Sequence, residues 1–174
     1  MNTFLVLTVI GDDKPGLVDS LSSVIAEHQG NWLESSMSQL AGKFAGILKV
    51  SVSNEHADAL VTALQGLSAD LKIVIEEASG AESGESPRTV ELNLVGNDRP
   101  GIVREISHAL ALLSVNVEQL NTECVPAPMS GGPLFKTRAI LRVPGEMALE
   151  NLQDELEGLA DDLMVEIKST EKEP

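Results

Sequence analysis

The stretch that decides the fold is Val9-Ile10-Gly11-Asp12-Asp13-Lys14-Pro15-Gly16-Leu17-Val18. It occurs again, 85 residues later, as Leu94-Val95-Gly96-Asn97-Asp98-Arg99-Pro100-Gly101-Ile102-Val103. Asn31 aligns with Asn116 at the same offset, and Ile47-Leu48-Lys49-Val50 matches Ile140-Leu141-Arg142-Val143 at a slightly larger one. Because self-similarity at a long period indicates a duplicated structural unit, the chain is predicted to hold two copies of one fold.

Each copy shows the same order of hydrophobic patterns. Strands rich in Val, Leu and Thr are predicted at 3–10 and 88–95, each followed by a helix with apolar residues at helical spacing. Pro15 and Pro100 are expected at the first helical position. Two strands and a second helix follow, and a short alternating strand closes each copy. The middle strands are expected at 32–40 and 43–53, joined by a turn at Ala41-Gly42, and at 116–125 and 134–143.

The order βαββαβ predicts an α+β, ferredoxin-like fold: a four-stranded antiparallel sheet with both helices on one face. The expected domains are residues 1–78 and 88–169, joined by a polar linker at 79–87 and followed by an acidic tail at 170–174. The second copy carries extra residues between its middle strands, in a Pro- and Gly-rich loop at 126–133.

Charge and composition exclude several classes of function. The formal net charge is −15, from 27 acidic and 12 basic residues, and such a field repels the phosphates of nucleic acids. A modest basic run, Lys136, Arg138 and Arg142, falls on one face of a predicted strand, where we expect an exposed sheet face or acidic neighbours. The chain has no Tyr, one Trp and three Phe, so it offers few rings for stacking on bases. Direct DNA or RNA binding is therefore not expected.

Catalytic and metal-binding patterns are not found in the sequence. Cys124 is the single cysteine, so an intramolecular disulfide is excluded and a reducing cytoplasm fits. Cys124 is predicted to be a small core residue rather than a nucleophile. No apolar run reaches the ~20 residues that span a bilayer. The sequence thus predicts a soluble, cytoplasmic, non-catalytic protein without a cofactor, a metal site or membrane contact.

The repeated turn has a chemistry of its own. A turn that opens a helix leaves backbone N–H groups unpaired, and these suit a carboxylate. Gly16 and Gly101 are expected to remove a side chain where a ligand or another backbone comes close. Asp13 and Asp98 could bind an ammonium group, so that the turn would recognise an α-amino acid. The same residues also make a good turn and helix start, with Asp bonding backbone donors, and both interpretations stay open.

The repeated pattern Gly-x-Asp-(Lys/Arg)-Pro-Gly-(Leu/Ile)-Val resembles the signature of ACT domains, small-molecule-binding regulatory modules. The resemblance covers residues 2–78 and 88–169, and it implies two ACT domains in tandem. In ligand-binding ACT domains the site lies between the first turn of one domain and the second strand of a neighbour. The residues that the resemblance assigns to ligand binding are Gly11, Asp13, Pro15, Gly16, Asn31, Gly96, Asp98, Pro100, Gly101 and Asn116.

The sequence departs from some amino-acid-binding ACT domains, which carry His where this chain has Gly11 or Gly96 and Asn in place of Asp13 or Asp98. The identity of the ligand is therefore open. Asn31 and Asn116 can also be read as turn residues that tolerate left-handed geometry.

The layout resembles the bacterial glycine cleavage system transcriptional repressor family. This resemblance implies an amino-acid sensor, with glycine as ligand, that acts on a transcriptional activator through protein contact. A homodimer is a further option. The alternative is an ACT-type allosteric subunit that acts in trans on an amino-acid-metabolic enzyme, or an ACT protein that has lost its ligand.

Overall fold

The computed structural model describes residues 1–78, 88–129 and 131–170. The chain divides into two compact units, Met1–Glu82 and Ser83–Pro174. The expected linker at 79–87 and residues 171–174 of the expected tail lie outside the described residues.

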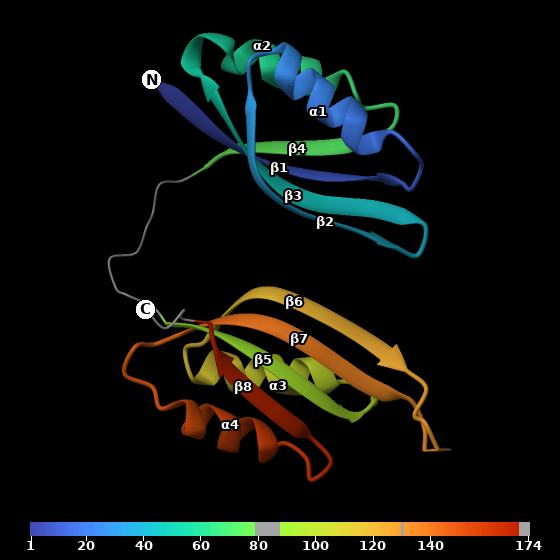
Figure 1. Ribbon diagram of the computed structural model, residues 1–174, viewed down its shortest axis with the longest axis vertical. Helices are drawn as coiled ribbons and strands as arrows, with labels where there is room; N and C mark the ends of the chain where they lie inside the picture. Colours follow the sequence, from blue (N-terminus) through green and yellow to red (C-terminus); the bar gives the residue numbers. More distant parts are fainter. Residues whose placement is uncertain (79–87, 130, 171–174) are drawn as a thin grey trace. The chain divides into compact units, whose positions relative to one another are not determined.

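The first unit is a four-stranded antiparallel sheet in the order β2-β3-β1-β4, and both helices cover one face of it (Figure 1). The fold class predicted from the sequence is confirmed. The elements are β1 (Asn2–Asp12), α1 (Leu17–Glu27), β2 (Asn31–Leu40), β3 (Lys43–Ser53), α2 (Asn54–Gln65) and β4 (Lys72–Glu77).

The core of the first unit follows directly from two periodicities. Successive side chains of a strand point to opposite faces, and the buried residues of β1 are accordingly Leu5, Leu7 and Val9. Helix α1 meets them with Leu17, Leu21 and Ile25, which are spaced by one turn, and α2 adds Leu60 and Leu64. Each such side chain contributes about 1.5–3 kcal/mol when fully buried. The face of the sheet that points away from the helices is left uncovered by this unit.

The second unit repeats the arrangement with the strand order β6-β7-β5-β8. Its core is again aliphatic, with Leu92 and Leu94 of the central strand packed against Ile106, Leu110 and Leu152 of the helices. The elements are β5 (Arg88–Asn97), α3 (Ile102–Leu112), β6 (Asn116–Val125), β7 (Leu134–Val143), α4 (Leu149–Glu157) and β8 (Met164–Ser169).

The strand register corrects one detail of the internal alignment. Thr8 lies opposite Ile47 in the first unit, and the equivalent Asn93 lies opposite Arg138 in the second. Ile47 is therefore equivalent to Arg138 and not to Ile140, as matching of the sequence suggested. A shift of two residues keeps every side chain on its face of the sheet, so the hydrophobic pattern alone does not detect it.

The start of the first helix in each unit also differs from the prediction. Helices α1 and α3 begin at Leu17 and Ile102, two residues after Pro15 and Pro100. The residues between, Gly16 and Gly101, have φ values of 92° and 89°. Because a helical residue cannot adopt this left-handed conformation, the helix starts only after the glycine.

Gly11 and Gly96 lie where the loop before the last strand crosses the end of the central strand. A Cβ atom on Gly11 would come within 2.3 Å of the carbonyl oxygen of Asp70, and one on Gly96 within 2.4 Å of Cδ2 of Leu163. Packing against a backbone oxygen therefore requires glycine at position 11, whereas at Gly96 the end of a leucine side chain would have to move.

Among the residues that the structure describes, no helix combines the length and the apolar character needed to cross a membrane.

We expect Gly11→Ala to lower the free energy of unfolding by about 2 kcal/mol or more, because the new methyl group would overlap a backbone carbonyl that cannot move independently. Gly42→Ala is the control: nothing lies within 4 Å of its Cβ position, and it bears only the strain of φ = 79°. That strain costs about 1 kcal/mol. Chemical denaturation measures both, and equal losses would contradict the packing role of Gly11.

Candidate functional site

The turn between the first strand and the first helix is built in the same way in both units. In the first unit the backbone N–H of Asp13 donates to the carbonyl oxygen of Gly42 at 2.9 Å, which ties the turn to the β2–β3 hairpin. In the second unit the N–H of Asp98 donates to the carbonyl oxygen of Pro133 at 2.9 Å. Each turn is thus fixed to the loop that joins the two middle strands.

Gly16 and Gly101 are the N-cap residues of the helices that follow, and neither helix has a side-chain cap. Their carbonyl oxygens accept the first helical hydrogen bonds, from Ser20 and Glu105. No other backbone of the same unit comes close to these glycines, since no described atom beyond the adjoining residues lies within 4 Å of either Cβ position. The close approach of a ligand stays a prediction. Positive φ is what requires glycine here, and the space beside each helix N-terminus stays open.

The charges around the first turn are paired except for one. Lys14 forms an ion pair with Asp70, and Lys43 forms one with Asp12. The hydrogen bond from Lys43 and its positive charge lower the pKa of Asp12. Asp13 is exposed, and its carboxylate has no hydrogen bond or ion pair among the described residues. The carboxylate of Asp13 therefore remains uncompensated just before the open N-terminus of α1. Asp19, in the first turn of the helix, is a second exposed carboxylate nearby.

In the second turn the equivalent carboxylate, that of Asp98, has different neighbours. Arg99 donates two hydrogen bonds to Glu105, at 2.8 and 2.6 Å, and the N–H of Asn97 donates to Asp162 at 2.7 Å. Asp98 lies beside the thiol of Cys124 on β6. Local packing around the sulfur raises the pKa of this thiol, and a hydrogen bond with Asp98 raises it further. The thiol thus stays protonated and acts as a partner of Asp98.

The prediction that Cys124 belongs to the core is wrong, because the residue is exposed. Its strand β6 lies at the edge of the sheet, and residues 116–124 are all exposed. An edge strand has a neighbour on one side only, so its inward-facing residues keep contact with water. The proximity of Cys124 to Asp98 was not foreseen, although the end of the second strand was expected near the loop at 126–133.

Asn31 and Asn116 begin β2 and β6 and are exposed, as the sequence suggested. Asn31 on β2 lies opposite Ser51 on β3, and Ser51 lies opposite Phe4, near the start of β1. The turn that carries Asp13 follows Asp12, at the other end of β1. Eight residues separate Phe4 from Asp12, about 26 Å along a strand. The second unit has the same register, so in neither unit do the Asp and the Asn of the expected site meet.

An apolar crevice lies between α3 and β6 in the second unit. Leu92 and Phe135 line it, and its rim includes the partly exposed Val103, Val117 and Leu120. Val103 is two residues from Gly101, so the crevice begins beside the second turn. It offers room for an aliphatic group and no charge to hold one in a fixed orientation.

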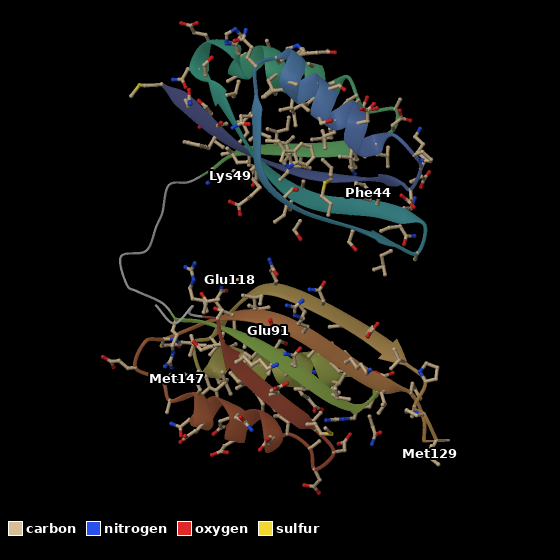
Figure 2. All side chains as sticks on the ribbon, in the orientation of Figure 1. Phe44, Lys49, Glu91, Glu118, Met129 and Met147 are labelled. Carbon is tan, nitrogen blue, oxygen red and sulfur yellow. The ribbon has the colours of Figure 1, made fainter. Side chains whose placement is uncertain are left out.

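Two of the three cations in the basic run of the second unit, Arg138 and Arg142, are paired with carboxylates. Lys136, Arg138 and Arg142 alternate outward on β7. Arg138 donates to Glu91 at 2.9 Å, and Arg142 donates to Glu118 at 2.7 Å. Glu91 and Glu118 project on the side of the sheet away from the helices (Figure 2). The expected exposed face with acidic neighbours is confirmed, and it supplies no continuous basic surface.

No group of His, Cys, Asp and Glu side chains suited to hold a metal ion occurs in the described ranges 1–78, 88–129 and 131–170.

Comparison with known proteins identifies the first of these units. Residues 3–77 match the family model of the ACT domain. The first unit is thus similar to ACT domains over nearly its whole length. The second unit shares its strand order and its turn, so the chain has a tandem ACT-like fold.

Three relatives extend this result. An unknown protein from Galdieria sulphuraria has the same fold, with a TM-score of 0.85 and 26% identity over 98% of this chain and 99% of that one. The glycine cleavage system transcriptional repressor of Escherichia coli is 22% identical over 163 residues, which cover 92% of this chain and 85% of that protein. A UPF0237 protein of Methanopyrus kandleri is 45% identical over 51 residues, 29% of this chain; the match spans only 57% of that relative.

We expect the carboxyl group of Glu91 to titrate near pH 2 in nuclear magnetic resonance experiments. Hydrogen bonds from Arg138, the larger cause, and from Asn93 lower its pKa from 4.5 to about 2. Since the folded pKa is depressed, the stabilisation from this pair is complete above about pH 4.5 and is lost as the pH falls through 2. Arg138→Ala should return the pKa toward 4.5, and a wild-type titration near 4.5 would contradict the pair.

Proposed function

We propose that the chain is a non-catalytic regulatory protein that senses a small amino acid. One observation carries this proposal: Asp13 is an uncompensated carboxylate beside an open helix N-terminus. The unpaired N–H groups of α1 suit the carboxylate of an amino acid, and Asp13 suits its ammonium group. The second turn offers the same two groups, the N–H donors of α3 and the carboxylate of Asp98. There the thiol of Cys124 would compete with a ligand for the Asp98 carboxylate.

Because the turn and the start of the second strand lie far apart in each unit, the proposed ligand would contact two domains. Asp13 and Asn31 lie near opposite ends of one sheet, separated by about eight residues of strand, or roughly 26 Å along β1, so a ligand held by both would join two domains. A ligand that binds only when two domains are correctly arranged shifts the population toward that arrangement. Binding of a molecule of a few atoms would thereby change the surface that the protein presents to a partner.

The similarity to the repressor of Escherichia coli supports a role in transcription of glycine cleavage genes, with glycine as the ligand. The net charge of −15 and the paired state of Arg138 and Arg142 argue that this control is exerted through a protein, a transcriptional activator in the cytoplasm, and not through DNA.

Calorimetric titration with the common amino acids should reveal one preferred ligand. The paired substitution Asp13→Ala and Asp98→Ala should abolish its binding, while circular dichroism shows an unchanged fold, since both side chains are exposed. Asp19→Ala, an exposed carboxylate in the first turn of α1, is the matched control and should retain binding. Undiminished binding by the double variant would show that the site lies elsewhere.

The isolated protein should cause no mobility shift of promoter DNA at physiological salt, and it should change the shift produced by its activator. Affinity capture from the native host identifies that partner. Recovery of a metabolic enzyme in place of a transcription factor would favour the alternative role as an allosteric subunit. Tight, salt-sensitive binding of the protein alone to duplex DNA would contradict the proposal.

A further inference from the structure

The two units differ most on the open face of the sheet, the face that points away from the helices. In the first unit the outward residues of β1 are Phe4, Val6, Thr8 and Ile10, between the buried Leu5, Leu7 and Val9. The equivalent residues of β5 in the second unit are Thr89, Glu91, Asn93 and Val95.

The neighbouring strands show the same contrast. Ile47 on β3 is 54% exposed and Val74 on β4 is 52% exposed, and both lie opposite Thr8. The residues at these register positions in the second unit are Arg138 and Glu166, opposite Asn93. We refer to Phe4, Val6, Ile10, Ile47 and Val74 as the apolar face.

The second unit shows that this fold does not require an apolar open face. Its strands pair in the same order with Glu91 and Arg138 in an ion pair where the first unit has Val6 and Ile47. Lys49 and Glu76 lie opposite Val6, and the ammonium group of Lys49 lies over the ring of Phe4, so charged groups are interleaved with the apolar ones. A cluster of exposed apolar side chains on one copy, where the duplicate carries charged ones, marks a surface that is covered in the working protein.

The charges around the apolar face indicate what covers it. Three lysines and three carboxylates lie on the same side of the sheet: Lys43, Lys49, Lys72, Asp12, Glu34 and Glu76. This surface is therefore locally neutral, although the chain as a whole has a net charge of −15. It is a surface on which two copies of the same acidic chain can meet without like-charge repulsion.

We propose that the apolar face packs against the apolar face of a second copy of this chain. An isologous interface requires one patch that complements itself, with apolar groups near the twofold axis and both signs of charge around them. Two open sheet faces stack about 10 Å apart, with their side chains interdigitated. This inference does not depend on the amino-acid ligand.

The test substitutes into the apolar face the residues that the second unit already carries at the same positions. Ile47→Arg and Val74→Glu are both compatible with the fold, as Arg138 and Glu166 show. Ile47→Arg makes the net charge of the chain less negative and Val74→Glu makes it more negative, so a loss of association in both variants cannot arise from the net charge of the chain. The matched control is Ile140→Arg, which makes the same change on the open face of the second unit.

Sedimentation velocity over a range of concentrations of the full chain measures the dissociation constant of the dimer. Each substitution in the apolar face buries two unpaired charges in a twofold interface, so the constant should rise by roughly 100-fold. Ile140→Arg should leave the constant unchanged, and thermal unfolding of dilute monomer should be similar for all variants.

Two outcomes would overturn the proposal. One is a wild-type chain that stays monomeric at the highest concentration reached. The other is a dimer that survives both Ile47→Arg and Val74→Glu, or that responds equally to Ile140→Arg, because its interface would then lie on another surface.

Discussion

Backbone pairing of the central strand on both of its sides is the constraint on which the rest of each unit depends. β1 pairs with β3 along its whole length and with β4 over its middle, residues 5–10, and β5 does the same with β7 and, over residues 90–95, with β8. With the crossovers on one side, both helices cover one face, and the other face is left open. The same pairing places the turn after β1 next to the turn that joins β2 and β3. There the backbone N–H of Asp13 donates a hydrogen bond to the carbonyl oxygen of Gly42.

Duplication of this scaffold has left the backbone nearly unchanged and the surfaces different. Gly16 and Gly101 adopt the same left-handed conformation. Around them, Lys14 forms an ion pair with Asp70 in the loop before β4, whereas Arg99 forms one with Glu105 on the helix that follows it. The carboxylate that follows the first strand is uncompensated in one unit and beside a thiol in the other. Two similar turns with different neighbours can hold one ligand with different affinities, or serve one ligand and one structural contact.

A receptor whose parts lie at opposite ends of a sheet is incomplete in a single domain. The proposed sensor therefore needs a second domain to supply the remaining contacts, and its response is a change in how domains associate. The apolar face on the first unit gives the molecule a surface for such association that is separate from the turns. Ligand binding and self-association could then be linked, since both act on the arrangement of the same domains.

The sequence by itself determined the duplication, the order of the elements, the cores and the role of the Asp-x-Pro-Gly turn as a strand-to-helix junction. These features follow from local patterns: periodicities of two and 3.6 residues, and the backbone freedom of glycine. Only the tertiary structure decided that Ile47 of the first unit is structurally equivalent to Arg138 of the second. A shift of two residues leaves the alternating pattern of a strand unchanged, so the sequence does not reveal it. The tertiary structure also placed Cys124 on an exposed edge strand beside Asp98. It placed Asp13 and Asn31 at opposite ends of one sheet. Finally, it showed that the open face of the sheet is apolar in the first unit and charged in the second. Each of these depends on which strands are neighbours and in what register, and hydrogen bonds between residues far apart in the chain fix both.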